Sequence, residues 1–352
     1  MGGVAFAATD VQTTANGARV LLFGGQRQGI SGAMYSFEQA SGDGWVLMPD
    51  GAEGAGPAPP PRTQHTLNSV GAEGSQDTII VFAGFLLNVG CENDLWRATV
   101  ELDELSMPVP RWSKVEAAGE PPCARYGHSA TTLEKKGKIV VCGGQDQTVQ
   151  YNDVFLLDFK ADAWSTPTVT GTPPIVRMKH TANAISDKTI LVFGGFNRQV
   201  DVRVMADAYK LELTGDDSVA WSAVTLGGPA GSKGIPARAQ HAACVTADMK
   251  HMFVFGGYNG EKVTNDLWHF ELGSMAVRQI GLETPLPEPR ARHSIHIIEG
   301  LLHVFGGYDN SKPCEGNVFT LDVSDPAGME DAAAGGDDKK KKEEKPQDED
   351  ED

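Results

Sequence analysis

Short apolar runs recur along the chain, and most of them end in a pair of glycines. The clearest runs are Thr78–Phe82, Ile139–Cys142, Ile190–Phe193 and Met252–Phe255. The glycine pairs are Gly24-Gly25, Gly143-Gly144, Gly194-Gly195, Gly256-Gly257 and Gly306-Gly307, with Ala83-Gly84 as a sixth, degenerate copy. Apolar runs this short, bounded by turn residues, predict β-strands that are covered on both faces.

Each apolar run belongs to a longer cassette. Asn-Asp follows the glycine pair, and then come a lone Trp, a Pro and the tetrad Arg-x-x-His. We expect the tetrad to lead into an inner strand, the apolar run to be the second strand, and Asn-Asp to open the third. The fourth strands carry Trp45, Trp112, Trp164 and Trp221. A repeat of roughly 50–60 residues with this content predicts an all-β propeller with one four-stranded blade per copy.

Local chemistry explains the recurring residue types. Glycine tolerates positive φ and close backbone approach, which lets the second strand end in a bend. Asn and Asp are expected to cap the turn before the third strand. The Trp buries a large area between blades, and prolines such as Pro121-Pro122 stiffen the crossover from blade to blade.

These cassettes resemble the kelch repeat, and the resemblance covers about nine-tenths of the chain. The chain is similar in style to the repeat-only intracellular kelch proteins of eukaryotes, among them a six-kelch effector of a Rab GTPase. The resemblance implies a six-bladed kelch β-propeller over residues 1–324. We find no segment like a BTB, BACK or F-box domain.

The first and last copies depart from the pattern. The first inner strand aligns as Val4–Thr9, so that Val4 stands in place of the histidine, and no Trp-bearing strand follows the sixth copy after Val323. One hypothesis is an incomplete last blade with three good strands, and the other is that further residues precede Met1. The fifth copy lacks its Trp as well, and Val277 is the nearest substitute.

Charge and composition limit the classes of partner. The net charge of the chain is −17. Residues 325–352 hold 12 Asp or Glu against 5 Lys, a composition that predicts a disordered acidic tail. Such a surface repels phosphate, so nucleic-acid and membrane partners are not expected. The five cysteines are scattered with no Cys-x-x-Cys, and the first residues do not resemble a signal peptide, which favours a cytoplasmic protein with reduced thiols.

The tetrads supply five arginines and five histidines that converge on the axis of the ring. The histidines are His65, His128, His180, His241 and His293. They recur with the repeat, so packing explains them without a metal, and such a ring is wider than metal–ligand distances allow. The string Glu261-x-x-x-Asn265-x-x-x-His269 resembles an iron motif of some plant kelch proteins, but Asn replaces its Asp. We therefore expect no metal, no cofactor and no enzyme activity.

One face of the ring is the candidate binding surface, because the loop after each glycine pair and the tetrad arginines should lie on the same side. Arginine and aromatic side chains on a rigid rim are typical of interface hot spots, and the kelch resemblance implies that such a face can hold acidic peptides. An alternative is that neighbouring carboxylates hold each arginine and that the aromatics pack on the next blade. The predicted partner-binding residues are Arg62, Arg125, Arg177, Arg238, Arg290, Phe85, Leu86, Leu87, Phe196, Tyr258 and Tyr308.

The sequence therefore predicts a non-enzymatic scaffold or adapter that presents a loop-lined face to a protein partner. One alternative is a subunit of a cytoskeletal or ciliary assembly that binds through blade edges, because an incomplete blade leaves a strand edge open. The other is an enzyme or small-molecule binder that uses the central channel. The acidic tail could also fold back on the arginine rim.

Overall fold

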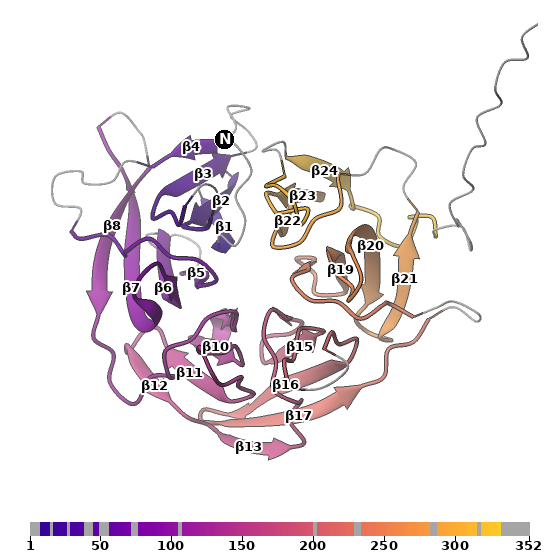
Figure 1. The fold of residues 1–352 in the computed structure, drawn as a ribbon, viewed down its shortest axis with the longest axis horizontal. Coiled ribbons are helices and arrows are strands. Elements are labelled where there is room, and N and C mark those ends of the chain that lie inside the picture. The colour runs from indigo at the N-terminus through magenta and orange to yellow at the C-terminus, as the bar shows by residue number, and fades with distance from the viewer. Residues whose placement is uncertain are drawn as a thin grey trace, which may run out of the picture.

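The chain forms a ring of six β-sheets around a central axis in a computed structural model (Figure 1). The structure describes residues 8–14, 17–26, 29–38, 45–48, 56–71, 77–104, 108–199, 203–228, 234–281, 287–314 and 318–331. Each sheet is one blade, and its strands follow one another outward from the axis. The prediction of an all-β six-bladed propeller is confirmed.

The strands of each blade follow the chain order. Blade one holds β1 (Ala8–Thr14), β2 (Gly17–Phe23), β3 (Met34–Glu38) and β4 (Trp45–Leu47), and blade two holds β5 (Thr66–Val70), β6 (Asp77–Leu86), β7 (Gly90–Leu102) and β8 (Pro108–Val115). Blade three holds β9 (Ser129–Leu133), β10 (Lys138–Cys142), β11 (Val154–Asp158) and β12 (Ala163–Ser165). Blade four holds β14 (Thr181–Ala184), β15 (Thr189–Phe193), β16 (Ala208–Gly215) and β17 (Ser218–Val224), with β13 (Thr168–Gly171) at its outer edge. Blade five holds β18 (Ala242–Val245), β19 (His251–Tyr258), β20 (Val263–Glu271) and β21 (Ala276–Ile280), and blade six holds β22 (Ser294–Ile298), β23 (Leu301–Phe305) and β24 (Phe319–Asp322).

The core lies between adjacent blades. Fourth-strand tryptophans pack on the preceding blade: Trp164 shares a cluster with Phe82 and Leu95, and Trp221 shares one with Val154 and Leu156. The apolar second strands are buried throughout, as both-face coverage requires. In the part of the chain that the structure describes, no helix has the length and apolar character needed to span a membrane.

Glycines in the crossovers fit against these tryptophans. Gly119 and Gly171 have φ of +79° and +74°, and a Cβ on either would overlap the carbonyl oxygen of Trp164 or Trp221 in the next blade. The segment after the fourth strand of blade three thereby pairs in parallel with β17 as strand β13. The sequence did not predict this fifth strand.

A ring of side chains joins the inner strands around the channel. Each lies two residues into its inner strand and reaches the next blade. Asp10 accepts a hydrogen bond from the Ser69 backbone N–H (2.6 Å), Thr131 donates to the Ala182 carbonyl (2.9 Å), and His296 contacts Thr9 (2.8 Å) across the junction of blades six and one. Asn68 and Asn183 make similar bonds to Ala130 and Ala243.

The two ends differ from the sequence alignment in one respect. β1 pairs Ala8 with Phe23, as β9 pairs Ser129 with Cys142, so Ala8, and not Ala5 as the predicted alignment requires, matches the residue after the histidine. The alignment of Val4 was wrong because blade one has no Arg-x-x-His tetrad to fix the register. The remaining residues of the predicted strand, Val4 to Ala7, lie outside the described residues.

Blade six has the three strands that the sequence predicts. The chain does not leave the ring after β24, because residues 325–331 lie against blade five and Asp331 bridges Ile280. The start of the predicted tail is thus in contact with the propeller. The rest of the tail, residues 332–352, lies outside the described residues.

Candidate functional site

The loops after the glycine pairs and the Arg-x-x-His tetrads share one face of the ring, which we call the loop face. Antiparallel bridges join Tyr126 to Gln145, Met178 to Phe196, and Ala291 to Tyr308. In each case the first residue after the arginine pairs with a residue that follows the glycine pair, so the face predicted from the sequence is brought together.

The ring arginines lie beneath the loop face. Arg62, Arg125, Arg177 and Arg238 are fully buried, and each makes two bonds to an aspartate that lies in the third strand of its own blade or directly before it. Arg62, for example, contacts Asp94 at 2.6 and 2.7 Å and donates to the Ala83 carbonyl at 2.9 Å. The pKa of Asp94 is lowered because the bonds from Arg62 outweigh the effect of burial. The prediction of an accessible arginine rim is therefore wrong for these four side chains.

The neighbouring asparagines also act differently from the predicted turn caps. Asn93, Asn152 and Asn265 each donate from the side chain to a proline carbonyl that precedes the next tetrad. Asn93, for example, reaches Pro122 at 3.1 Å. The Asn-Asp pair therefore joins its strand to two places: the aspartate holds the arginine of its own blade, and the asparagine holds the crossover to the next.

Arg290 is the exception among the ring arginines. It is 5% exposed and donates to the carbonyls of Glu288 (3.1 Å) and Gly306 (2.7 Å). Among the described residues it has no carboxylate partner, and burial lowers its pKa. The sequence has Asn317 at the place of the aspartate, outside the described residues.

The ring histidines are buried and neutral. Burial, with a smaller contribution from the nearby arginines, lowers the pKa of His65, His180 and His293 to about 3. Most bond to the preceding blade: His180 contacts the Ser129 hydroxyl at 2.9 Å, and His241 contacts Thr181 at 2.9 Å. No group of side chains with metal-binding geometry occurs in the described ranges. The contacts of the ring histidines therefore join neighbouring blades.

The second residue after each ring arginine forms an inner ring at the mouth of the channel. Gln64, Gly127, Lys179, Gln240 and Arg292 all have positive φ. Backbone hydrogen bonds join these residues from one blade to the next. The first runs from the Gly127 N–H to the Gln64 carbonyl (3.0 Å), and the last from the Arg292 N–H to the Gln240 carbonyl (2.9 Å). This left-handed conformation is unusual for residues other than glycine and directs their side chains away from the strand path.

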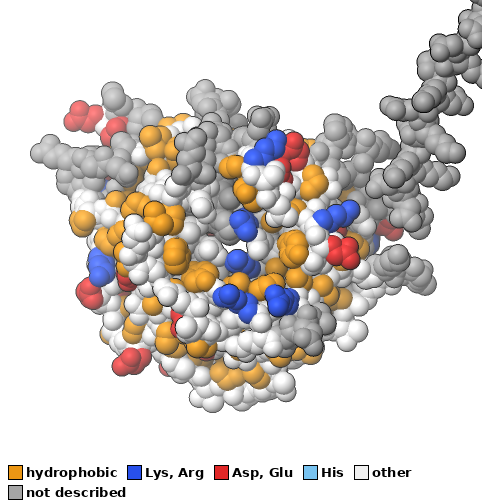
Figure 2. Space-filling model, viewed as in Figure 1, with side chains coloured by type: hydrophobic (Ala, Val, Ile, Leu, Met, Phe, Trp, Pro, Cys, Tyr) orange, Lys and Arg blue, Asp and Glu red, His pale blue; other side chains and the backbone are white. Residues whose placement is uncertain are grey.

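Lys179 and Arg292 of this inner ring lie near a third cation, the loop residue Arg198. Burial, together with the charges of Arg292 and Arg198, lowers the pKa of Lys179 to about 8. Arg292 lies over the Tyr308 ring at 5.3 Å and donates to the Gln240 side chain at 2.6 Å. The channel mouth is therefore positive in a strongly acidic chain. Figure 2 shows Lys and Arg side chains near the centre of the face in view.

The predicted loop residues divide into buried and exposed groups. Leu86 is buried, Phe85 packs edge-on against Tyr126, and Phe196, Tyr258 and Tyr308 are half-buried. Leu87 is 61% exposed at the tip of the β6–β7 hairpin. Sequence reasoning missed two further exposed residues, Val89 (64%) and Val149 (46%). Both lie in loops that follow a copy of the glycine pair. Sequence reasoning also missed Lys179 and Arg292, which occupy the variable positions of the tetrads.

Comparison with known proteins agrees with this geometry. Residues 104–317 match the model of the Attractin/LZTR1 β-propeller family. The chain is 30% identical over 217 residues to a protein named Kelch domain-containing protein 3 from Bos taurus, covering 56% of this chain and 53% of that one. It is 32% identical over 196 residues to the flagellar outer-arm dynein alpha chain of Chlamydomonas reinhardtii, covering 53% of this chain and 4% of that one. With the Drosophila melanogaster Leucine-zipper-like transcriptional regulator 1 homolog, identity is 26% over 268 residues, 72% of this chain and 26% of that one.

The chain spans about half the length of the first curated relatives that it matches. The family match extends from the outer part of blade two to blade six, and every blade within it carries the buried tetrad histidine described above. The chain is therefore a kelch-repeat propeller and belongs to the Attractin/LZTR1 β-propeller family.

Proposed function

We propose that this propeller is a non-enzymatic scaffold or adapter whose loop face holds an acidic segment of a protein partner. The observation that carries the proposal is the approach of Lys179, Arg198 and Arg292 at the channel mouth. Because the chain as a whole is acidic, a local group of cations concentrates its attraction for carboxylates at one place.

Exposed apolar side chains are the second feature of the loop face. Leu87, Val89 and Val149 are exposed on neighbouring loops of blades two and three. Gln150 accepts a hydrogen bond from the Arg198 backbone at 2.6 Å, which joins the loop of blade three to that of blade four. We call these six residues, Leu87, Val89, Val149, Lys179, Arg198 and Arg292, the loop-face patch. Apolar contact area beside positive charge is suited to a peptide that carries both kinds of side chain.

The rest of the predicted site supports this patch from beneath. The five ring arginines fix the glycine-pair loops. Phe85 packs on Tyr126 of the next blade, and Tyr308 lies beneath Arg292. A face held in this way loses little conformational entropy on binding. All five cysteines are free thiols, which supports a reducing compartment such as the cytoplasm.

Quantitative affinity capture from the source cells tests the proposal. The baits are the intact chain, the variant Lys179→Glu/Arg198→Glu, and the variant Leu87→Ser/Val89→Ser. The control is Lys135→Glu/Lys136→Glu, which changes two cations on the β9–β10 turn, at the opposite end of its inner strand from the tetrad. We expect a partner that the intact chain and the control retain and both patch variants lose. Equal capture by all four baits would overturn the proposal.

A second candidate is a subunit of a cytoskeletal or ciliary assembly that binds through a blade edge. It is supported by the similarity to a flagellar dynein chain and by β24, which has no outer neighbour among the described strands. Thr320→Pro on β24 would block strand addition. Loss of partners in this variant, with the loop-face variants unaffected, would favour this candidate.

A further inference from the structure

The junction between blades five and six lacks two contacts that hold several of the other junctions. Ala242 offers no hydroxyl to His293, which contacts the Phe255 carbonyl instead (3.1 Å). Cys244 occupies the channel-ring position of Asn183 and Thr131, yet it has no hydrogen bond to blade six in the described structure. Blade six also supplies no fourth strand to pack on blade five.

Residues 325–331, which we call the strap, lie in the place of that strand. Met329 packs on the cluster of Phe255, Leu267 and Ile280, as a fourth-strand tryptophan does at other junctions. Gly281 donates to the Glu330 carbonyl at 3.0 Å, and Asp331 bridges Ile280. The strap therefore adds both apolar and backbone contacts where the repeat lacks them.

One arginine of blade five makes most of the polar contacts to the strap. Arg278 on β21 donates to the carbonyls of Met329 (2.6 Å) and Pro326 (2.6 Å) and to the Asp331 carboxylate (2.7 Å). Its Nε also donates to His269 Nδ1 at 3.3 Å, and His269 Nε2 lies 2.9 Å from His251 Nδ1.

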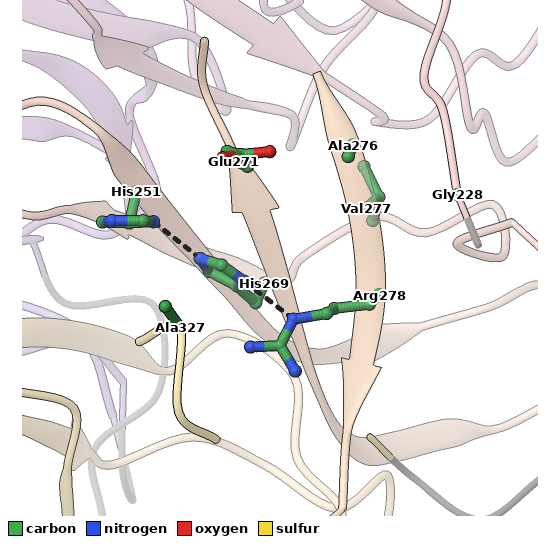
Figure 3. A pocket seen from close by; sticks show the side chains of 8 residues that line it. All are labelled: Gly228, His251, His269, Glu271, Ala276, Val277, Arg278 and Ala327. Atoms are coloured by element: carbon green, nitrogen blue, oxygen red, sulfur yellow. Dashed lines mark hydrogen bonds between the residues drawn. The ribbon is translucent and has the colours of Figure 1, made fainter. Parts of the chain in front are cut away.

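These three side chains line a cavity of about 460 Å³ between the strap and blade five (Figure 3). Ala327 of the strap forms part of its wall. In blade two, Arg97 occupies the position of His269 and reaches the Phe159 carbonyl and Asp162 in blade three. A side chain at this position thus faces the next blade, and the cavity lies where blade six has no corresponding hairpin.

We propose that the strap is a detachable brace across the junction of blades five and six, anchored by Arg278, and that protonation of the His251–His269 pair weakens the anchor. The Arg278 Nε–H can only donate, so His269 Nδ1 must be unprotonated. His269 then donates from Nε2 to His251 Nδ1, and both imidazoles are neutral.

An added proton disturbs this chain of bonds at either ring. On His269 it removes the acceptor for Arg278 and places a second cation beside the guanidinium. On His251 Nδ1 the added proton points at the N–H of His269 Nε2, so this hydrogen bond is lost. If His269 moves its own proton to Nδ1 to restore the bond, Nδ1 can no longer accept from Arg278. The other charged groups near His269 are the Glu271 and Asp331 carboxylates. The pKa of His269 is lowered to about 4 by burial and by Arg278, so the anchor is intact above pH 6.5 and weakens as pH falls toward 4.

Hydrogen exchange of the full chain, read by mass spectrometry at pH 7.5 and pH 5 and corrected for the intrinsic rate, tests the proposal. For the wild type we expect exchange in the strap and β21 to be about tenfold faster at pH 5. Arg278→Met should show that fast exchange already at pH 7.5. His269→Gln keeps an acceptor without the titration, so its exchange should not respond to this pH change.

Arg97→Met is the control, because it removes an arginine contact to the next blade, between blades two and three, at the position that His269 holds in blade five. It should leave exchange in the strap as in the wild type. Strap exchange that is the same in Arg278→Met and wild type would overturn the anchor. A pH response in His269→Gln equal to that of the wild type would overturn the role of the histidines. Circular dichroism confirms that each variant is folded.

Discussion

At the scale of single residues, the repeat uses charge to hold its backbone. Four fully buried guanidinium groups each bond an aspartate and a glycine-loop carbonyl of the same blade. Burying a charge is unfavourable, but removing one partner of a buried pair leaves the other uncompensated and is more unfavourable still. This explains why Arg and Asp recur together without implying a binding role for either.

Removing one aspartate should expose that dependence. We expect Asp94→Asn to lower the free energy of unfolding by about 3 kcal/mol, because it leaves the Arg62 charge buried with a neutral neighbour. The exposed pair Arg111–Glu101 in the same blade provides the control. Glu101→Gln should change stability by less than about 1 kcal/mol. Urea unfolding measures both, and equal effects would show that burial of the pair does not decide its contribution.

Asp10 is a carboxyl whose burial should cost stability at neutral pH. Desolvation raises its pKa to about 6, although the N–H groups of Ser69 and Val11 act in the opposite direction. A raised pKa in the folded state gives stability that is present below pH 3.8 and is lost as pH rises through 6. Asp10→Asn should therefore raise the melting temperature at pH 7.5 by a few degrees, on the order of 1 kcal/mol.

The same substitution should have little benefit at pH 4.5, where the wild-type carboxyl is protonated in the folded state. Differential scanning fluorimetry at the two pH values compares the variants. A stabilisation that is the same at both would show that the effect of Asn does not come from the charge.

At the scale of elements, local chemistry made most strands predictable. Gly tolerates the bend after the second strand, and Trp marks the fourth, so the bounds of blades two to four follow from the sequence. β13 and the strap could not be predicted, because their pairing depends on backbone proximity between segments and not on their own apolar pattern. β1 was placed three residues too early, since blade one has neither the arginine nor the histidine that fixes register elsewhere.

The crossover glycines offer a test of element packing. In Gly171→Ala the new Cβ would overlap the Trp221 carbonyl oxygen at a φ of +74°. We expect a loss of about 1–3 kcal/mol, because both the overlap and the left-handed conformation are unfavourable for alanine. Gly273→Ala is the control, since nothing lies within 4 Å of its new Cβ. Urea midpoints that move equally for both would argue against a close fit at β13.

At the scale of the whole molecule, the sequence predicted the ring but not which cations reach its surface. The tetrad arginines recur and attract attention, yet their recurrence follows from an internal pairing with Asp. Lys179, Arg198 and Arg292 occupy positions that vary from blade to blade, and only the closed ring brings them together. Burial of a charged side chain depends on partners distant in sequence, so motif spacing alone could not separate the two groups.

The five ring histidines make the whole propeller sensitive to acid. Their pKa values are lowered in the folded state by burial and by the adjacent arginines. A depressed pKa gives stability that is present above the unfolded value of 6.5 and is lost as pH falls below it toward the folded-state pKa. Because all five protons are taken up on unfolding, we expect the urea midpoint to fall steeply between pH 6.5 and pH 4. His180→Asn should make that decline shallower, because the unfolded state then binds one proton fewer. A wild-type midpoint that stays constant over this range would show that the buried histidines do not control acid unfolding.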